Sequence, residues 1–200
     1  MLRRLSALAA LPVLLAAGVG LPGCQTAPQA DDVPEPVAAD TAAALPVQPD
    51  MAVATLTALD SSGVTGRVAF RRLGEATEVR YSVAGLTPGE HGIHLHQNAA
   101  CGADSTGEAG TAAGPHFNPL ASPHGAPVAA LTARHAGDFG NLIADETGRA
   151  EGILIDSVLT FDGPTALVGH AVIVHAGRDD LATQPGGDSG GRVACGVTAR

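Results

Sequence analysis

Lysine and tryptophan are absent from this 200-residue sequence, which contains only one tyrosine and four phenylalanines. All eleven basic residues are therefore arginine, and twenty acidic residues give a formal net charge of -9. This charge argues against nucleic acid as a partner, because binding to phosphates requires a positive surface. With so few aromatic rings, the core must be built from aliphatic side chains. The length suggests one domain, or one domain with a tail.

The first 23 residues have the composition of a targeting segment. A basic start with Arg3 and Arg4 precedes an apolar, uncharged stretch over residues 5–21. This pattern is typical of a secretory signal peptide, so export of the protein is expected. An uncleaved anchor is an alternative, because the apolar stretch is nearly long enough to span a bilayer. Pro12 and the small residues at the end of the segment favour cleavage.

The targeting segment ends in Leu21-Pro-Gly-Cys24, which resembles a bacterial lipobox. The resemblance implies that Cys24 is acylated, becomes the mature N-terminus and anchors the protein to a membrane; an ordinary secretory signal is the alternative. The expected location is the bacterial cell envelope or periplasm. Residues 24–50 are rich in Ala, Pro and acidic residues and show no periodicity, which predicts a flexible tether before a folded domain over residues 51–200.

Residues 51–200 show the alternation of apolar and polar residues that is typical of β-strands. Glycine and proline separate the apolar runs, and no stretch has a convincing helical period. The predicted strands are residues 51–59, 66–73, 77–86, 91–96, 142–145, 149–156, 168–175 and 193–198. Short strands with such turns predict an antiparallel sandwich or barrel. Two long loops, 97–140 and 176–191, interrupt the pattern, and loops of this length are usually functional or disordered.

Two of the eight histidines, His94 and His96, lie two positions apart on a predicted strand. Residues i and i+2 of a strand point to the same side, so these imidazoles can bind one metal ion. Two solvated surface histidines are the alternative interpretation. Further candidate ligands follow in loops and at strand ends: His116, His124, His135, Asp138 and His175. This accumulation of the commonest metal ligand favours a metal site.

Seven candidate side chains suffice for two metal ions if one imidazole uses both of its nitrogens. An all-imidazole site favours copper, because four nitrogens can form the tetragonal arrangement of Cu(II). Three histidines and one aspartate can complete a tetrahedral zinc site. Three candidates lie on a single loop and suit a closed zinc site: His124, His135 and Asp138. Three others come from strands or strand ends and suit a rigid, reactive site: His94, His96 and His175. His116 lies between the two groups in sequence.

Several motifs follow one another along residues 51–200. They are His91-Gly-Ile-His94-Leu-His96, Gly114-Pro-His116-Phe-Asn-Pro119, His124-Gly125, His135-Ala-Gly-Asp138, Val174-His175 with Asp179-Asp180, and Gly191-Arg192-Val-Ala-Cys195-Gly196. In residue type and order they resemble copper,zinc superoxide dismutase, and the position of Cys101 after His96 resembles the bacterial branch. The resemblance implies an eight-stranded, antiparallel Greek-key β-barrel of two packed sheets with two long functional loops. It implies an enzyme that converts superoxide to dioxygen and hydrogen peroxide by cycling Cu(II) and Cu(I).

The resemblance also implies one copper and one zinc ion per chain. The implied copper ligands are His94, His96, His116 and His175. The implied zinc ligands are His116, His124, His135 and Asp138, so that His116 bridges the two metals. As the bridging ligand, His116 would also take up and return a proton during catalysis.

The same resemblance implies roles for residues outside the ligand sets. His91 would support the ligand strand, and Asp179 would link a copper ligand to a zinc ligand. Arg192 would orient the anionic substrate beside copper; without the motif, a solvated arginine would be the preferred interpretation. Cys101 and Cys195 would form a disulfide, which leaves Cys24 for lipidation. His170 matches no ligand.

A non-enzymatic protein that binds or delivers copper on the same fold is the second interpretation. Such a protein would typically lose a copper ligand or Arg192, and this sequence retains all of them. A zinc-stabilised adhesion domain is a third interpretation, which leaves the three strand-borne histidines unexplained. Superoxide is the expected substrate, and a homodimer is a possible assembly.

Long-range attraction of superoxide is expected to be weak. The loop over residues 176–191 contains Arg178 as its only basic residue, against Asp179, Asp180 and Asp188. A field that guides the anion would therefore need other arginines, such as Arg134 or one contributed by a partner subunit.

Overall fold

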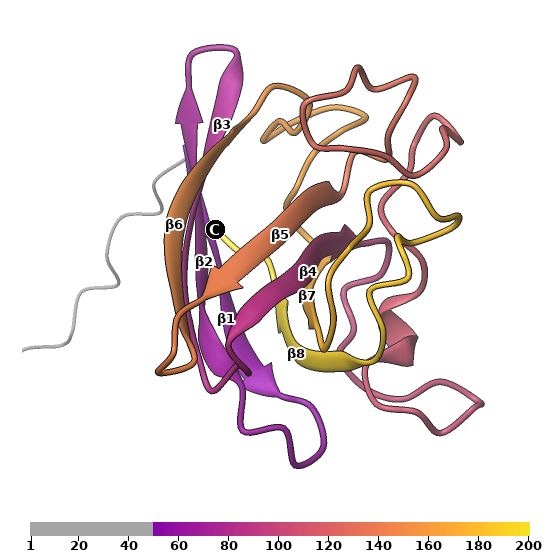
Figure 1. The fold of residues 1–200 in the computed structure, drawn as a ribbon. Coiled ribbons are helices and arrows are strands. Elements are labelled where there is room, and N and C mark those ends of the chain that lie inside the picture. Colours follow the sequence, from indigo (N-terminus) through magenta and orange to yellow (C-terminus); the bar gives the residue numbers. More distant parts are fainter. Residues whose placement is uncertain (1–49) are drawn as a thin grey trace, which may run out of the picture. The chain divides into compact units, whose positions relative to one another are not determined.

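The computed structural model describes residues 50–200 (Figure 1). The expected signal peptide over residues 1–23, the lipidated Cys24 and residues 24–49 of the expected tether lie outside the described residues. Within the described range, no helix is long and apolar enough to cross a membrane.

Eight β-strands form an all-β domain, as the alternation of the sequence predicts. The strands are β1 (Met51–Ala58), β2 (Thr65–Leu73), β3 (Ala76–Ala84), β4 (Gly89–His96), β5 (Asp138–Ala144), β6 (Arg149–Asp156), β7 (Ala171–His175) and β8 (Arg192–Val197). A short 3-10 helix, η1 (Thr111–Ala113), lies in the loop after β4. The predicted fold class is confirmed.

Neighbouring strands all pair antiparallel, in the order β5-β4-β7-β8-β1-β2-β3-β6. Because β6 returns beside β3 and β7 returns beside β4, the chain follows a Greek-key path. The two terminal strands of this order, β5 and β6, lie close together without a hydrogen-bonded register, so the barrel is nearly closed. Both long loops lie beside the barrel, near the ends of β4 and β7 (Figure 1).

The barrel interior is filled by alternate residues of the strands. In β1, for example, Ala52, Ala54 and Leu56 are buried, and the residues between them are more exposed. β4 is different, because every residue from His91 to His96 is buried. Its aliphatic side chains belong to the hydrophobic core, whereas His94 and His96 lie beneath the long loops. The loops therefore give the outer face of β4 the environment of an interior site.

Two predicted boundaries are wrong by more than two residues. β5 begins at Asp138, so it takes in the last residues of the loop that was predicted over 97–140. β7 begins at Ala171 instead of residue 168, because Gly169 adopts a φ of 85° and turns the chain. The first correction places a candidate ligand at the start of a strand, where the sheet fixes its backbone.

Candidate metal centre

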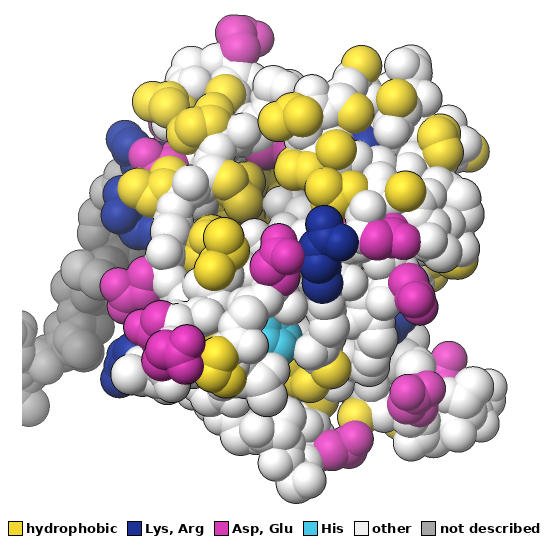
Figure 2. All heavy atoms as spheres, in the orientation of Figure 1, with side chains coloured by type: hydrophobic (Ala, Val, Ile, Leu, Met, Phe, Trp, Pro, Cys, Tyr) yellow, Lys and Arg dark blue, Asp and Glu magenta, His cyan; other side chains and the backbone are white. Residues whose placement is uncertain are grey.

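Two groups of buried side chains have ligand atoms within 4.8 Å of one another. The first group consists of His94, His96, His116 and His175. The second group consists of His116, His124, His135 and Asp138. All seven predicted ligands are thus brought together from β4, the loop after it, β5 and β7, and His116 belongs to both groups. Histidine is barely visible on the molecular face in Figure 2.

Hydrogen bonds on the outer side of each ring orient the first group. His96 Nδ1 donates to Gly114 O at 2.8 Å, and His175 Nδ1 donates to Gly190 O at 3.0 Å. His94 is turned the other way, and its Nε2 donates to Asp179 Oδ2 at 2.8 Å. The opposite nitrogens are buried and have no hydrogen-bond partner within residues 50–200: His94 Nδ1, His96 Nε2 and His175 Nε2. Buried lone pairs of this kind fit a metal ion.

Burial also keeps these imidazoles neutral, because it penalises the charged ring. It lowers the pKa of His94, and it lowers the pKa values of His96 and His175 well below the ordinary range. Burial likewise lowers the pKa of His116 to about 4. Neutral nitrogens can bind a metal ion without first losing a proton.

Asp138 lies at the centre of the second group. Its Oδ1 is 2.8 Å from His116 Nδ1 and 3.1 Å from both His124 Nδ1 and His135 Nδ1. Its Oδ2 accepts hydrogen bonds from the backbone amides of His135 and Gly125 at 2.8 and 3.1 Å. Tetrahedral zinc with bonds of about 2.0–2.1 Å separates its ligand atoms by roughly 3.3 Å. The four donors of this group are therefore spaced as zinc requires.

At neutral pH the second group carries a proton on His124, whereas the imidazoles of the first group are neutral. Burial raises the pKa of Asp138, but hydrogen bonds from His116, His124 and His135 outweigh it and bring that pKa well below its usual range. Burial lowers the pKa of His124, but the nearby carboxylates of Asp138 and Asp179 outweigh it and raise that pKa to about 9. Zinc would have to displace this proton from the metal-free protein at neutral pH.

Asp179 connects the two groups. Its Oδ2 accepts from His94 Nε2 at 2.8 Å, and its Oδ1 accepts from His124 Nε2 at 2.9 Å. The backbone of Asp179 is held by Asn141 of β5: Asp179 N donates to Asn141 Oδ1 at 2.7 Å, and Asn141 Nδ2 donates to Asp179 O at 2.9 Å. Asn141 is not among the site residues predicted from the sequence, where its only signal is its position three residues after Asp138.

The remaining two histidines contact neither group of ligand atoms. The His91 ring lies between two carbonyl oxygens, with Nδ1 2.9 Å from His175 O and Nε2 2.9 Å from Thr87 O. It therefore ties the start of β4 to the end of β7. His170 stacks on Phe117 with 4.0 Å between ring centroids.

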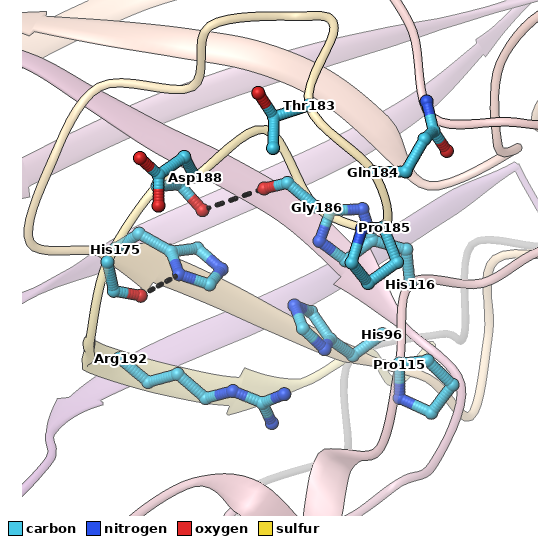
Figure 3. Close-up of a pocket in the computed structure, with 12 residues that line it drawn as sticks. His96, Pro115, His116, His175, Thr183, Gln184, Pro185, Gly186, Asp188 and Arg192 are labelled. Atoms are coloured by element: carbon cyan, nitrogen blue, oxygen red, sulfur yellow. Dashed lines mark hydrogen bonds between the residues drawn. The ribbon is translucent and has the colours of Figure 1, made fainter.

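A cavity of about 340 Å³ opens beside the first group. His96, His116 and His175 line its inner side, and Arg192 borders it (Figure 3). Arg192 Nη1 donates to Gly110 O at 2.5 Å, and Nη2 donates to Gly114 O at 2.8 Å. Burial lowers the pKa of Arg192, but a guanidinium remains a cation at physiological pH. The cavity thus combines three ligand imidazoles with one fixed positive charge.

The long loop after β4 is fastened to the barrel by a disulfide. Cys101 and Cys195 are bonded, with 5.6 Å between their Cα atoms and a sequence separation of 94. This disulfide joins the loop that carries three of the ligands to β8.

Comparison with known proteins identifies the family. Residues 64–198 match the family model described as copper/zinc superoxide dismutase (SODC). The chain belongs to the copper/zinc superoxide dismutase family. It is 42% identical over 145 residues to the superoxide dismutase [Cu-Zn] of Saccharomyces cerevisiae, which covers 68% of this chain and 90% of that relative. The crystal structure of the clock protein EA4 is similar with a TM-score of 0.65 and 34% identity, over 76% of this chain and 94% of that one.

As a copper/zinc superoxide dismutase, the chain is an oxidoreductase that uses copper and zinc to disproportionate superoxide. The two adjoining groups of ligand side chains and the disulfide agree with this function. The alternative of a copper carrier without catalysis is not favoured.

Proposed function

We propose that each group of ligands binds one metal ion during superoxide disproportionation, copper in the first group and zinc in the second. Copper would be held by His94, His96, His116 and His175. Zinc would be held by His116, His124, His135 and Asp138. The observation that carries this proposal is the sharing of His116 by an all-imidazole group and a group with a carboxylate. Imidazole donors suit copper, and three histidines with one aspartate suit zinc.

Copper, when bound, supplies one-electron chemistry between Cu(II) and Cu(I), by which one superoxide is oxidised to dioxygen and a second is reduced to hydrogen peroxide. The protein has to admit the anion, hold it and deliver protons. Arg192 borders the cavity with its guanidinium fixed by two carbonyl oxygens, so it can hold superoxide beside the copper ligands. Its two anchors leave little freedom for reorientation.

His116 is the residue placed to carry a proton. It lines the cavity, while its Nδ1 lies 2.8 Å from Asp138 Oδ1 in the zinc group. This leaves the one lone pair of Nε2, which would either bind copper or carry a proton that can be passed to the reduced substrate. Asp179 holds the rings of His94 and His124 in one orientation, so the two groups keep their relative position.

Metal analysis of histidine variants tests the assignment. His116→Ala should reduce both copper and zinc and abolish activity, whereas His124→Ala should mainly remove zinc. His170→Ala is the matched control, because His170 lies outside both groups, and it should retain both metals and full activity. Full occupancy of both metals in His116→Ala would show that the shared-ligand assignment is wrong.

We also propose that the chain is a bacterial lipoprotein of the cell envelope or periplasm, with residues 1–23 as signal peptide and Cys24 as the lipid-bearing residue. The basic and apolar start of the sequence and the Leu-Pro-Gly-Cys motif support this proposal. The disulfide supports it as well, because such bonds persist in oxidising compartments. Residues 24–50 would then connect the anchor to the enzyme domain over residues 51–200.

We also propose that the enzyme domain forms a homodimer. Exposed isoleucines on β5 and β6, namely Ile143, Ile153 and Ile155, offer apolar surface that a second copy could cover. Light scattering on the purified domain distinguishes a dimer from a monomer.

A further inference from the structure

Residues 183–187, a segment of the loop between β7 and β8, lie against both groups of ligands. A Cβ atom on Gly186 would be 3.3 Å from His116 Nε2. A Cβ atom on Gly187 would overlap Asp179 Oδ1 and lie 2.8 Å from His124 Nε2. Gly187 also has a φ of 71°, which favours glycine. The segment is therefore packed directly on the link that joins the copper group to the zinc group.

Gln184 attaches this segment to a single zinc ligand. The amide of Gln184 pairs with both backbone groups of His124: Oε1 accepts from His124 N at 2.7 Å, and Nε2 donates to His124 O at 3.0 Å. Figure 3 shows the Gln184 amide pointing away from the three histidines of the cavity. Within residues 50–200, these are the hydrogen bonds that join segment 183–187 to the loop carrying His116, His124 and His135.

The same segment forms the outer wall of the cavity beside the copper ligands. Thr183, Gln184, Pro185 and Gly186 all line it, opposite His96 and Arg192 (Figure 3). Access to copper therefore depends on where the segment lies. Hydrogen bonds within its own loop hold the segment, such as Asp180 N to Gly187 O at 2.8 Å, and the two bonds of Gln184 fix it to the His124 backbone. That backbone is in turn fixed when the His124 ring is bound to zinc.

We propose that Gln184 is a positioning residue that makes access to copper depend on zinc occupancy. This inference rests on the proposed assignment of zinc to His124. With zinc bound, the fixed His124 backbone holds Gln184, and Gln184 holds segment 183–187 over the cavity. Without zinc, the His124 ring keeps its contacts with Asp138 and Asp179 but loses its bond to the metal, so the two hydrogen bonds have a less firmly fixed partner and the cavity wall opens more often.

Removal of Cu(II) by a macrocyclic polyamine chelator tests the proposal in the full chain. The chelation rate is measured for copper-loaded protein with and without zinc, and the ratio of the two rates is the protection by zinc. In Gln184→Ala this protection should fall roughly tenfold, the size expected for the loss of the two neutral hydrogen bonds to His124. The variant also loses the bond from Gln184 Nε2 to Ala182 O at 3.1 Å, which lies within the same loop. Gln184→Glu keeps the acceptor and loses the donor, so it should lie between Gln184→Ala and the wild type.

Arg178→Gln is the matched control. It removes an exposed ion pair of the same loop, in which Arg178 Nε lies 2.9 Å from Glu90 Oε2, without touching the zinc group. Protection by zinc should remain at the wild-type value. A merely structural role of Gln184 would destabilise the chain without altering the ratio of the two rates.

Wild-type protection in a Gln184→Ala protein that binds one zinc per chain would overturn the proposal. If Gln184→Ala loses zinc, the proposal is tested instead by the zinc protection of Gln184→Glu and by amide hydrogen exchange of the wild type. Exchange over residues 183–187 should accelerate when zinc is removed, and an unchanged exchange rate would also overturn the proposal. Zinc analysis of His124→Ala tests the zinc assignment separately: a variant that retains zinc would show that His124 is not a zinc ligand.

Discussion

Arg192 and His96 donate to the same acceptor, the carbonyl oxygen of Gly114, each at 2.8 Å. This one oxygen holds the guanidinium that borders the cavity, and its bond to His96 Nδ1 leaves His96 Nε2 as the nitrogen that faces the other imidazoles of the first group. The guanidinium at the cavity and the proposed copper ligand His96 are thus kept in a constant relation. Each keeps a hydrogen bond to Gly114 O if the other is removed.

The first prediction concerns Arg192→Ala. The superoxide rate constant should fall roughly tenfold at every salt concentration, because a charge-assisted contact to the anion is lost at short range. Copper content should be unchanged, since His96 keeps its bond to Gly114. Arg192→Lys should be intermediate, because an ammonium cannot reproduce the forked anchoring. Pulse radiolysis and copper analysis measure both effects, and unchanged activity in Arg192→Ala would remove the proposed role.

A second prediction is that superoxide is not guided over long distances. Arg178 is paired with Glu90. Arg134, which the sequence left as a possible source of guidance, is fully buried and ion-paired to Asp156. Asp188, a carboxylate, lines the cavity. The rate constant should therefore change little, or rise slightly, as ionic strength increases from low to physiological. A steep fall in a pulse-radiolysis salt series would contradict this.

Asp188→Asn offers a sharper form of the same test. Removal of one negative charge at the cavity should raise the rate constant about twofold at low ionic strength, and salt should abolish the difference. Glu75→Gln in the β2–β3 turn makes the same change of charge outside the cavity lining and should have little effect. An equal rise in both variants would mean that net charge, and not the position of Asp188, controls the rate.

A third prediction follows from the pKa of about 9 for His124 in the metal-free protein. The bound proton stabilises the metal-free fold fully below about pH 6.5, and this contribution is lost as pH rises through about 9. Zinc competes with the proton, so zinc affinity should rise with pH over that window. At about pH 7.5, zinc binding should release about one proton from His124.

Titration calorimetry in two buffers of different ionisation enthalpy measures the released proton. His124→Asn is the control, because it removes the group that titrates, and its zinc binding should release correspondingly fewer protons. A wild-type release near zero would contradict the raised pKa of His124.

The fourth prediction concerns Cys24. The mature chain should begin at an acylated Cys24, and several acyl chains would anchor it firmly because each buried CH₂ adds about 0.8 kcal/mol. Intact mass of the membrane-extracted protein measures the modification. Cys24→Ala should release the protein from the membrane fraction and leave copper, zinc and specific activity unchanged. An unmodified Cys24, or another mature N-terminus, would refute the lipoprotein proposal.

The sequence by itself determined the chemistry and the class of fold. Alternation with Gly/Pro turns specified β-strands, because side chains of a strand point to opposite faces in turn. The spacing of His94 and His96 placed two imidazoles on one side of a strand, and the order of the later histidines and Asp138 indicated two groups of ligands. These features are local, or follow from residue type, so they can be read without knowing which distant segments meet.

Tertiary structure alone decided which ring nitrogen of the buried histidines is left free of hydrogen bonds, because the orienting partners are backbone oxygens and carboxylates far away in sequence. Asp179, which lies 85 residues after His94, binds its Nε2 and leaves Nδ1 free. In His96 the free nitrogen is Nε2, because Gly114 O binds Nδ1. The roles of Asn141 and Gln184 depend in the same way on contacts 38 and 60 residues apart. Arg134 shows the converse case: its charge is visible in the sequence, but only packing shows that it is buried and cannot act on a substrate.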